Sequence, residues 1–178
     1  MVLFLLALEH KFCPKPFRFL EIGAYREGRV PCYACCPQLV DIEVGDFSSQ
    51  KIDEVWNSKE MQDIRASILE GSFKFCKVED CPEILSNALP DRAAVEEPRL
   101  KKIIKEKKTL LDHGPEIINL SYDETCNLAC PSCRTDYINL NHDIERTLVI
   151  ENLQKDLLAQ GLTDAKEILF CSSGDPFA

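Results

Sequence analysis

The stretch EIINLSYDETCNLACPSCR, residues 116–134, places three closely spaced cysteines behind a short apolar run. The apolar residues predict a strand over residues 116–121. Cys126, Cys130 and Cys133 follow it in a C-x3-C-x2-C pattern. A structural zinc site needs four ligands, whereas a cubane iron–sulfur cluster held by three thiolates keeps one iron open to bind something else. The incomplete ligand set therefore points to a reactive centre rather than a structural one.

The sequence after the cysteines predicts a helix and then a second strand. Apolar residues recur at roughly helical spacing over residues 144–160, and Gly161 is well placed to end that helix. Residues 165–171 then form another apolar run typical of a strand. The pattern is a βαβ unit with the cysteine loop at the carboxyl end of its first strand. In barrels built from such units, that end carries the active site.

The cysteine spacing resembles the signature of the radical S-adenosylmethionine superfamily. In that family the cysteines hold a 4Fe-4S cluster whose open iron binds S-adenosylmethionine. One electron then cleaves the sulfonium, and the resulting 5′-deoxyadenosyl radical abstracts hydrogen from the substrate. The resemblance implies that Cys126, Cys130 and Cys133 bind the catalytic cluster. It puts Ser132 at a position beside the cofactor where the family often has an aromatic residue.

A turn after the second predicted strand extends this resemblance. Residues 172–176 read SSGDP, which is similar to the Gly-Gly-Glu element that holds the amino group of S-adenosylmethionine in the family. Carried over by position, Ser173, Gly174 and Asp175 match this element. The resemblance assigns no side chain a direct role in hydrogen transfer.

A second group of cysteines lies in the first 90 residues, and thiolates there suit an iron–sulfur cluster or zinc. Its six members are Cys13, Cys32, Cys35, Cys36, Cys76 and Cys81. With the CPKPF run at residues 13–17 and the IDEVWNS run at residues 52–58, the region resembles the SPASM/twitch auxiliary-cluster domain of many radical S-adenosylmethionine enzymes. The resemblance implies a second 4Fe-4S cluster held by Cys13, one of the three middle cysteines, Cys76 and Cys81. In most relatives such a domain follows the radical motif, whereas here it precedes it.

Two helices are expected within this cysteine-rich region. Ser49 can cap a helix over residues 50–56, and Ser58 can cap a longer one over residues 59–70 that ends at Gly71. Trp56 is expected to be a packing anchor for the loop that carries the cysteines. The apolar stripe of the longer helix is expected to be core, and it consists of Met61, Ile64, Ile68 and Leu69.

These elements together predict a mixed α/β fold. A small Cys-rich α+β auxiliary-cluster domain is expected over residues 1–90, a linker and helix over 91–114, and the first βαβ unit of a partial (β/α)6 TIM-like barrel over 115–178. A full eight-stranded barrel typically needs ~250 residues. The sequence is therefore expected to be the amino-terminal portion of a longer enzyme and to be inactive alone.

Composition limits the partners and the compartment. A net charge of −9 argues against a nucleic-acid partner held by phosphate contacts. Cysteines grouped in motifs favour a reducing, cytoplasmic location over a disulfide scaffold. The apolar start at residues 1–8 is too short to span a membrane. The expected partners are S-adenosylmethionine, an electron donor such as flavodoxin or ferredoxin, and a substrate for which a peptide is one candidate.

Three alternatives stay open at this point. Zinc could use Cys126, Cys130 and Cys133 with His142 as the fourth ligand. The first cysteine group could hold zinc or no metal. The whole chain could be a non-catalytic metal-binding module or an electron relay.

Overall fold

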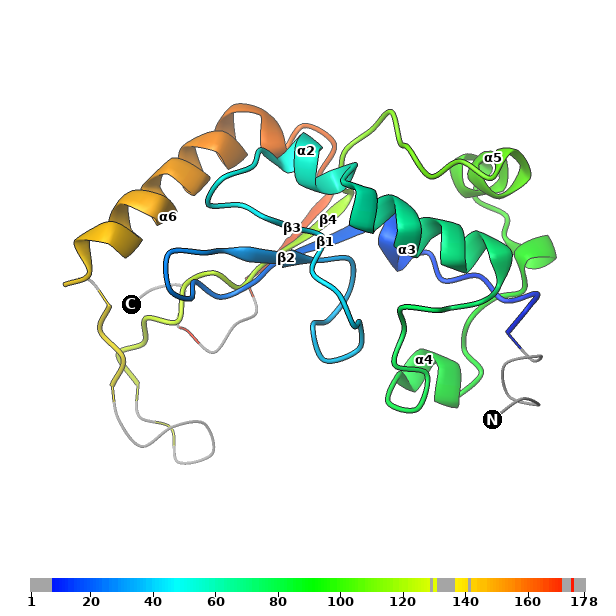
Figure 1. The fold of residues 1–178 in the computed structure, drawn as a ribbon, viewed down its shortest axis with the longest axis horizontal. Helices are drawn as coiled ribbons and strands as arrows, with labels where there is room; N and C mark the ends of the chain where they lie inside the picture. Colours follow the sequence, from blue (N-terminus) through cyan, green and yellow to red (C-terminus); the bar gives the residue numbers. More distant parts are fainter. Residues whose placement is uncertain (1–7, 129, 131–136, 141, 171–173, 175–178) are drawn as a thin grey trace.

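A five-stranded mixed sheet runs through the centre of the computed structural model, which describes residues 8–128, 130, 137–140, 142–170 and 174 (Figure 1). The strand order is β3-β2-β1-β4-β5. The strands are β1 Phe19–Ile22, β2 Pro31–Tyr33, β3 Gly45–Asp46, β4 Ile117–Leu120 and β5 Glu167–Leu169. The helices are η1 Lys15–Phe17, α2 Ile52–Trp56, α3 Lys59–Glu70, α4 Pro82–Leu85, η2 Arg92–Ala94, α5 Pro98–Glu106, α6 Ile144–Asp156 and a π-helical turn η3 Leu157–Gly161. The expected mixed α/β class is confirmed.

Strands β1 and β2 form a hairpin with a tight turn. Arg26 and Arg29 exchange two backbone hydrogen bonds of 2.9 Å each. Between them Glu27 and Gly28 have φ angles of 49° and 82°. Positive φ at both central residues is what a two-residue hairpin turn of this kind requires. The chain therefore reverses at Glu27 and Gly28 between β1 and β2.

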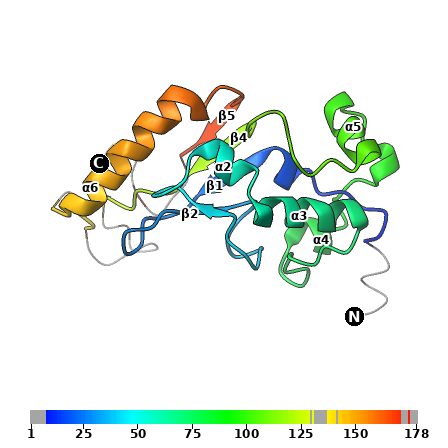
Figure 2. The same cartoon turned by 45° about the horizontal axis from the view of Figure 1, so that its top comes forward.

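The hairpin and the predicted βαβ unit belong to one sheet (Figure 2). Strand β1 pairs in parallel with β4, with Ile22 opposite Leu120, and β4 pairs in parallel with β5. Helix α6 lies between β4 and β5 in the chain, so the expected βαβ arrangement is present. Its place in a TIM-like barrel and the division at residues 90 and 114 stay predictions, but the sheet runs across that division.

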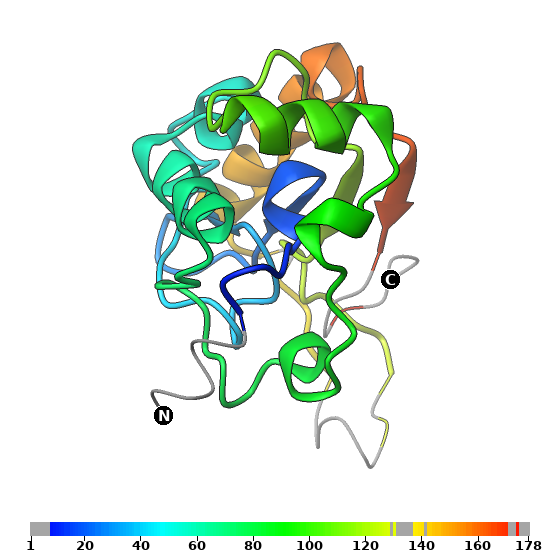
Figure 3. The same ribbon diagram turned by 90° about the vertical axis from the view of Figure 1, so that its right-hand side faces the viewer.

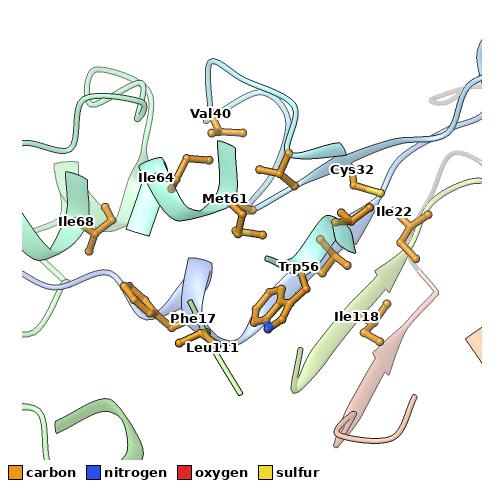
Figure 4. Close-up of a cluster of buried hydrophobic side chains, with 14 of the residues drawn as sticks. Phe17, Ile22, Cys32, Val40, Trp56, Met61, Ile64, Ile68, Leu111 and Ile118 are labelled. Atoms are coloured by element: carbon orange, nitrogen blue, oxygen red, sulfur yellow. The ribbon is translucent and has the colours of Figure 1, made fainter. Parts of the chain in front are cut away.

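The hydrophobic core lies between the sheet and its covering helices (Figure 4). Leu20, Ile22 and Ile118 from the sheet are fully buried. Trp56 packs in the same core, and its Nε1 donates a hydrogen bond of 2.7 Å to the backbone oxygen of His113. Trp56 is thus a buried packing residue that anchors α2 to the segment leading into β4, whereas an anchoring role for the cysteine-bearing loop stays a prediction.

Helix α3 has the bounds that the sequence predicts. The Ser58 side chain accepts a hydrogen bond from the backbone of Met61, and Gly71 ends the helix in the left-handed conformation. All four members of its expected apolar stripe are buried. The expectation for the shorter helix is corrected, because Ser49 does not cap it. Lys51 occupies the N-cap of α2, and its backbone N–H donates to the Glu54 carboxylate.

The elements after the three cysteines are shorter than predicted. Helix α6 ends at Asp156 and continues as the π-helical turn η3 up to Gly161. Ile150 and Leu153 are buried, but Leu148 is exposed, so only part of the apolar pattern faces the core. Strand β5 covers only Glu167–Leu169 of the predicted residues 165–171.

The chain around residues 89–95 packs against the amino-terminal segment. Leu89 and Val95 are buried. The backbone of Arg92 donates to the oxygen of His10 at 2.8 Å, and the backbone of Phe12 donates to the oxygen of Pro90 at 2.9 Å. Helix α5 follows as a separate short helix, seen end-on at the right of Figure 1 and at the top of Figure 3. Within the described ranges, no helix has the length and apolar character needed to cross a bilayer.

Candidate metal centres

Backbone pairing gathers the three groups of the first cysteine set. Val40 forms an antiparallel bridge with Cys76. This bridge places the loop after Cys35 beside the third group. Lys11 forms a similar bridge with Asp91, which brings the Cys13 segment next to the chain that follows α4. These bridges bring segments that are far apart in the sequence side by side.

Four of the six cysteines line one pocket. Each of the three groups contributes at least one of them, and the four are Cys13, Cys35, Cys76 and Cys81. Apolar side chains complete the wall, among them Ile64, Phe73 and Leu89. Cys81 directly precedes α4, whose first helical residue is Pro82. A proline there starts a helix without losing a hydrogen bond, so α4 begins at a fixed point next to the Cys81 sulfur.

The other two cysteines are placed differently. Cys32 pairs with Ile22 across the hairpin, and its side chain therefore shares the core-facing side of the sheet (Figure 4). It is fully buried, and its Sγ lies 3.7 Å from the backbone oxygen of Val30. Cys36 is half-buried and is not among the residues that line the pocket. The register of β1 and β2 explains the place of Cys32, because strand alternation turns its side chain to the face that Ile22 shares.

Burial and mutual repulsion dominate the electrostatics of the four thiols. Burial raises the pKa of Cys13 and of Cys76 to about 12 each, and the nearby Cys35 and Cys81 raise both further. Burial likewise raises the pKa of Cys35 to about 11, against a lowering effect of the Lys15 ammonium. These raised pKa values favour the protonated thiols. A bound metal has the opposite effect, because it favours the thiolates and releases the protons.

The four residues fit an iron–sulfur cluster with four thiolate ligands, in both donor type and number. The cavity that these residues enclose is small, with a volume of about 30 Å³. Within the described part of the chain, no three Cys, His, Asp or Glu side chains are arranged to hold a metal ion. The four sulfurs therefore share a pocket but not a preformed coordination shell.

The second candidate centre begins at the carboxyl end of β4. We call residues 126–138 the three-cysteine loop, because Cys126 and Ile138 close it with backbone hydrogen bonds of 2.8 and 3.2 Å. Cys126 is buried at the base of this loop, and the backbone N–H of Leu128 points to its sulfur at 3.4 Å. Cys130 is exposed. The predicted site residues Cys133, Ser132, Ser173 and Asp175 lie outside the described residues.

Two arginines hold the backbone that leads into the three-cysteine loop. Arg146, in the first turn of α6, is 4% exposed and pairs with Asp123. Arg26, from the β1–β2 hairpin, forms a bidentate ion pair with Glu124. Sequence patterns did not reveal either arginine, because each contact joins residues that are far apart in the chain.

Gly174 packs against the same backbone. A Cβ atom at this position would lie 2.3 Å from the Asp123 oxygen and 3.0 Å from the Thr125 oxygen. Only glycine allows so close an approach. The structure thus brings one residue of the predicted S-adenosylmethionine element to the start of the three-cysteine loop.

A larger cavity lies at the other end of the parallel strands. Its volume is about 370 Å³, and its wall includes Trp56, Asp53, Asp112 and Asp164. Among the residues that the structure describes, none of the predicted site residues lines this cavity. In barrels of parallel strands, that end serves stability, and the opposite end carries the active site.

Comparison with known proteins bears on the first centre. Residues 13–82 match the family model of SPASM, an iron–sulfur cluster-binding domain. We call residues 13–82 the SPASM segment. The match supports the predicted auxiliary-cluster domain and iron–sulfur binding, and it includes all six cysteines of the first group. No curated protein and no solved structure matches the chain.

Proposed function

We propose that this chain belongs to a radical S-adenosylmethionine enzyme that carries two 4Fe-4S clusters. Cys126, Cys130 and Cys133 hold the catalytic cluster in this proposal, and Cys13, Cys35, Cys76 and Cys81 hold the auxiliary one. When bound, the catalytic cluster supplies the electron that cleaves the sulfonium of S-adenosylmethionine. The substrate class is open, with a peptide as one candidate, and the electron donor is a small protein such as flavodoxin or ferredoxin.

The observation that carries the proposal is the contact of Gly174 with the backbone before Cys126. Two parallel strands, β4 and β5, end next to each other, and each is followed by one part of the expected cofactor site. The cysteines follow β4, and the element that includes Gly174 follows β5. The SPASM match adds weight, because such domains are typical of radical S-adenosylmethionine enzymes.

The residues of this site have separable roles in the proposal. Arg146 and Arg26 fix the chain before Cys126 through Asp123 and Glu124. The N–H of Leu128 lies next to the Cys126 sulfur, and N–H contacts to ligand sulfurs stabilise the thiolate and tune a cluster. The resemblance gives Ser132, Ser173 and Asp175 contacts with S-adenosylmethionine.

Binding of S-adenosylmethionine to the catalytic cluster is the direct test. We expect the electron paramagnetic resonance spectrum of the anaerobically reconstituted, dithionite-reduced protein to change when S-adenosylmethionine is added. The change requires an open iron at a cluster with three thiolate ligands. The Cys126→Ala variant should lose the response completely and keep the auxiliary signal.

The matched control is Cys13→Ala, which should keep the response to S-adenosylmethionine. A reduced spectrum that stays unchanged in the wild-type protein would favour the alternative, a non-catalytic iron–sulfur module or electron relay.

A further inference from the structure

One lysine faces the four thiols of the SPASM segment. Lys15 lines the same pocket as Cys13, Cys35, Cys76 and Cys81. It begins the η1 helix, two residues after Cys13 and between Pro14 and Pro16. Those prolines restrict the backbone on both sides. The position of Lys15 relative to the Cys13 sulfur is therefore fixed by the same short turn that presents the ligand.

Lys15 acts electrostatically on two of the four sulfurs. Its positive charge lowers the pKa of Cys13 and of Cys35, against the larger raising effect of burial. The backbone of Lys15 also lowers the pKa of Cys13. The side chain and the main chain of one residue thus both favour negative charge in the pocket.

Thirteen ion pairs occur among the described residues, and none of them includes Lys15. Lys15 therefore has no carboxylate partner in this part of the chain. It is half-buried. The acid in the pocket wall is Glu83, which is exposed. Burial raises the pKa of Glu21 in β1, and the side chain of Asn119 and the charge of Lys15 lower it in part, but Glu21 forms no ion pair with Lys15 among the described residues. A half-buried, unpaired cation beside four thiols lacks the anion that would balance it.

We propose that Lys15 is the counter-charge of the auxiliary cluster and raises its reduction potential. A cubane core held by four thiolates is a net anion, and reduction adds a further negative charge. A fixed cation stabilises the more negative, reduced form more than the oxidised form. Lys15 is a positioning residue, because it tunes the cluster without binding iron. This inference rests on the proposed auxiliary cluster.

The test measures the potential of the auxiliary cluster alone. The background variant carries Cys126→Ala, Cys130→Ala and Cys133→Ala, so that only the SPASM segment holds a cluster. Dithionite titration with redox mediators is followed by electron paramagnetic resonance. For Lys15→Met we expect the reduced-to-oxidised ratio at fixed potential to fall about tenfold, which is a downward shift of about 59 mV for a one-electron couple.

Charge-matched variants separate electrostatics from packing. Lys15→Arg should stay within about twofold of the parent, because it keeps the charge. Glu83→Gln should shift the potential upward, and by less, because Glu83 is exposed. Lys74→Met is the control, since Lys74 is an exposed lysine outside the pocket wall, and it should leave the potential unchanged.

Three results would overturn the inference. The potential of Lys15→Met could equal that of the parent, Lys74→Met could shift it equally, or both Lys15→Met and Lys15→Arg could lose the cluster. The last result would make Lys15 a packing residue. A background protein that binds no iron and sulfide would instead refute the auxiliary cluster itself, so the two failures are distinguishable.

Discussion

At the scale of single residues, two contacts fix the backbone that leads into the three-cysteine loop. Gly174 reaches the chain before Cys126 because it has no side chain. Arg146 reaches the same chain from α6 and is buried there with Asp123 as its partner. Both contacts fix the path of residues 123–125, from which the three-cysteine loop starts.

Gly174→Ala should therefore disturb the proposed catalytic centre selectively. Its added methyl group would meet the Asp123 oxygen at 2.3 Å, which is far inside van der Waals contact, so the backbone must shift. We expect the iron bound at the three-cysteine loop to fall by more than half and the auxiliary cluster to remain. Iron and sulfide assays with electron paramagnetic resonance of the reduced protein measure both effects.

Gly114→Ala is the matched control for that experiment. Its nearest contact would be a flexible carboxylate oxygen of Asp164 at 3.3 Å, at the other end of β4. It should bind iron like the wild type. Equal iron loss in both variants would contradict a specific role for the Gly174 contact.

At the scale of elements, one buried carboxylate ties three segments to the start of β4. Glu116 is 1% exposed and accepts hydrogen bonds from Arg18 at 2.9 Å and from Arg99 of α5 at 2.8 Å. Lys166, just before β5, lies 3.1 Å from the same carboxylate. Burial alone would raise the pKa of Glu116, but Lys166 and Arg18 outweigh it and hold the pKa below its usual value.

Loss of this carboxylate charge should destabilise the fold. We expect Glu116→Gln to lower the free energy of unfolding at pH 7 by about 3 kcal/mol, because three cations lose a buried partner. A carboxylate with a depressed pKa stabilises the folded state above its unfolded pKa of 4.5, and this contribution disappears as the pH falls through the folded pKa. The difference between wild type and variant should therefore shrink below pH 4.5. Urea unfolding across pH measures it.

Glu97→Gln provides the comparison for Glu116→Gln. Glu97 lies 3.4 Å from Arg18 and is 34% exposed. A pair in such a position contributes about 0.5 kcal/mol or less. Equal losses in the free energy of unfolding of both variants at every pH would contradict the stabilising role of the Glu116 carboxylate.

The elements also show what local patterns can predict. Helix α3 could be predicted to the residue, because Ser58, Gly71 and the apolar stripe are local signals. The Ser49 cap was wrong because a lysine backbone and Glu54 satisfy the start of α2 instead. The pairing of β1 with β4 could not be predicted, since no local signal joins strands that are so far apart in the chain.

In the candidate centres too, local sequence patterns predict some features and long-range contacts determine the others. Cysteine spacing named the residues that could bind iron, but it could not choose among Cys32, Cys35 and Cys36. The fold separates them, because Cys32 shares the face of Ile22 and Cys35 lines the pocket. Lys15 was visible in the sequence beside Cys13, but its role depends on Cys35, which only folding brings near.

At the scale of the whole molecule, one sheet connects the two cysteine groups. The hairpin of the SPASM segment supplies β1, and β1 is the parallel neighbour of β4, which leads into the three-cysteine loop. Arg26 of the same hairpin binds Glu124 just before that loop. The SPASM segment therefore contacts the backbone that leads into the second candidate centre, in addition to carrying its own thiols.

The count of clusters tests the central claim most directly. After anaerobic reconstitution, we expect about eight irons and eight sulfides per chain, as two cubanes require. Replacing Cys126, Cys130 and Cys133 by alanine should remove about four of each, and replacing Cys13, Cys35, Cys76 and Cys81 should remove the other four. Cys32→Ala should bind the full amount. Stoichiometric zinc without sulfide, or loss of a whole cluster from Cys32→Ala alone, would contradict the account.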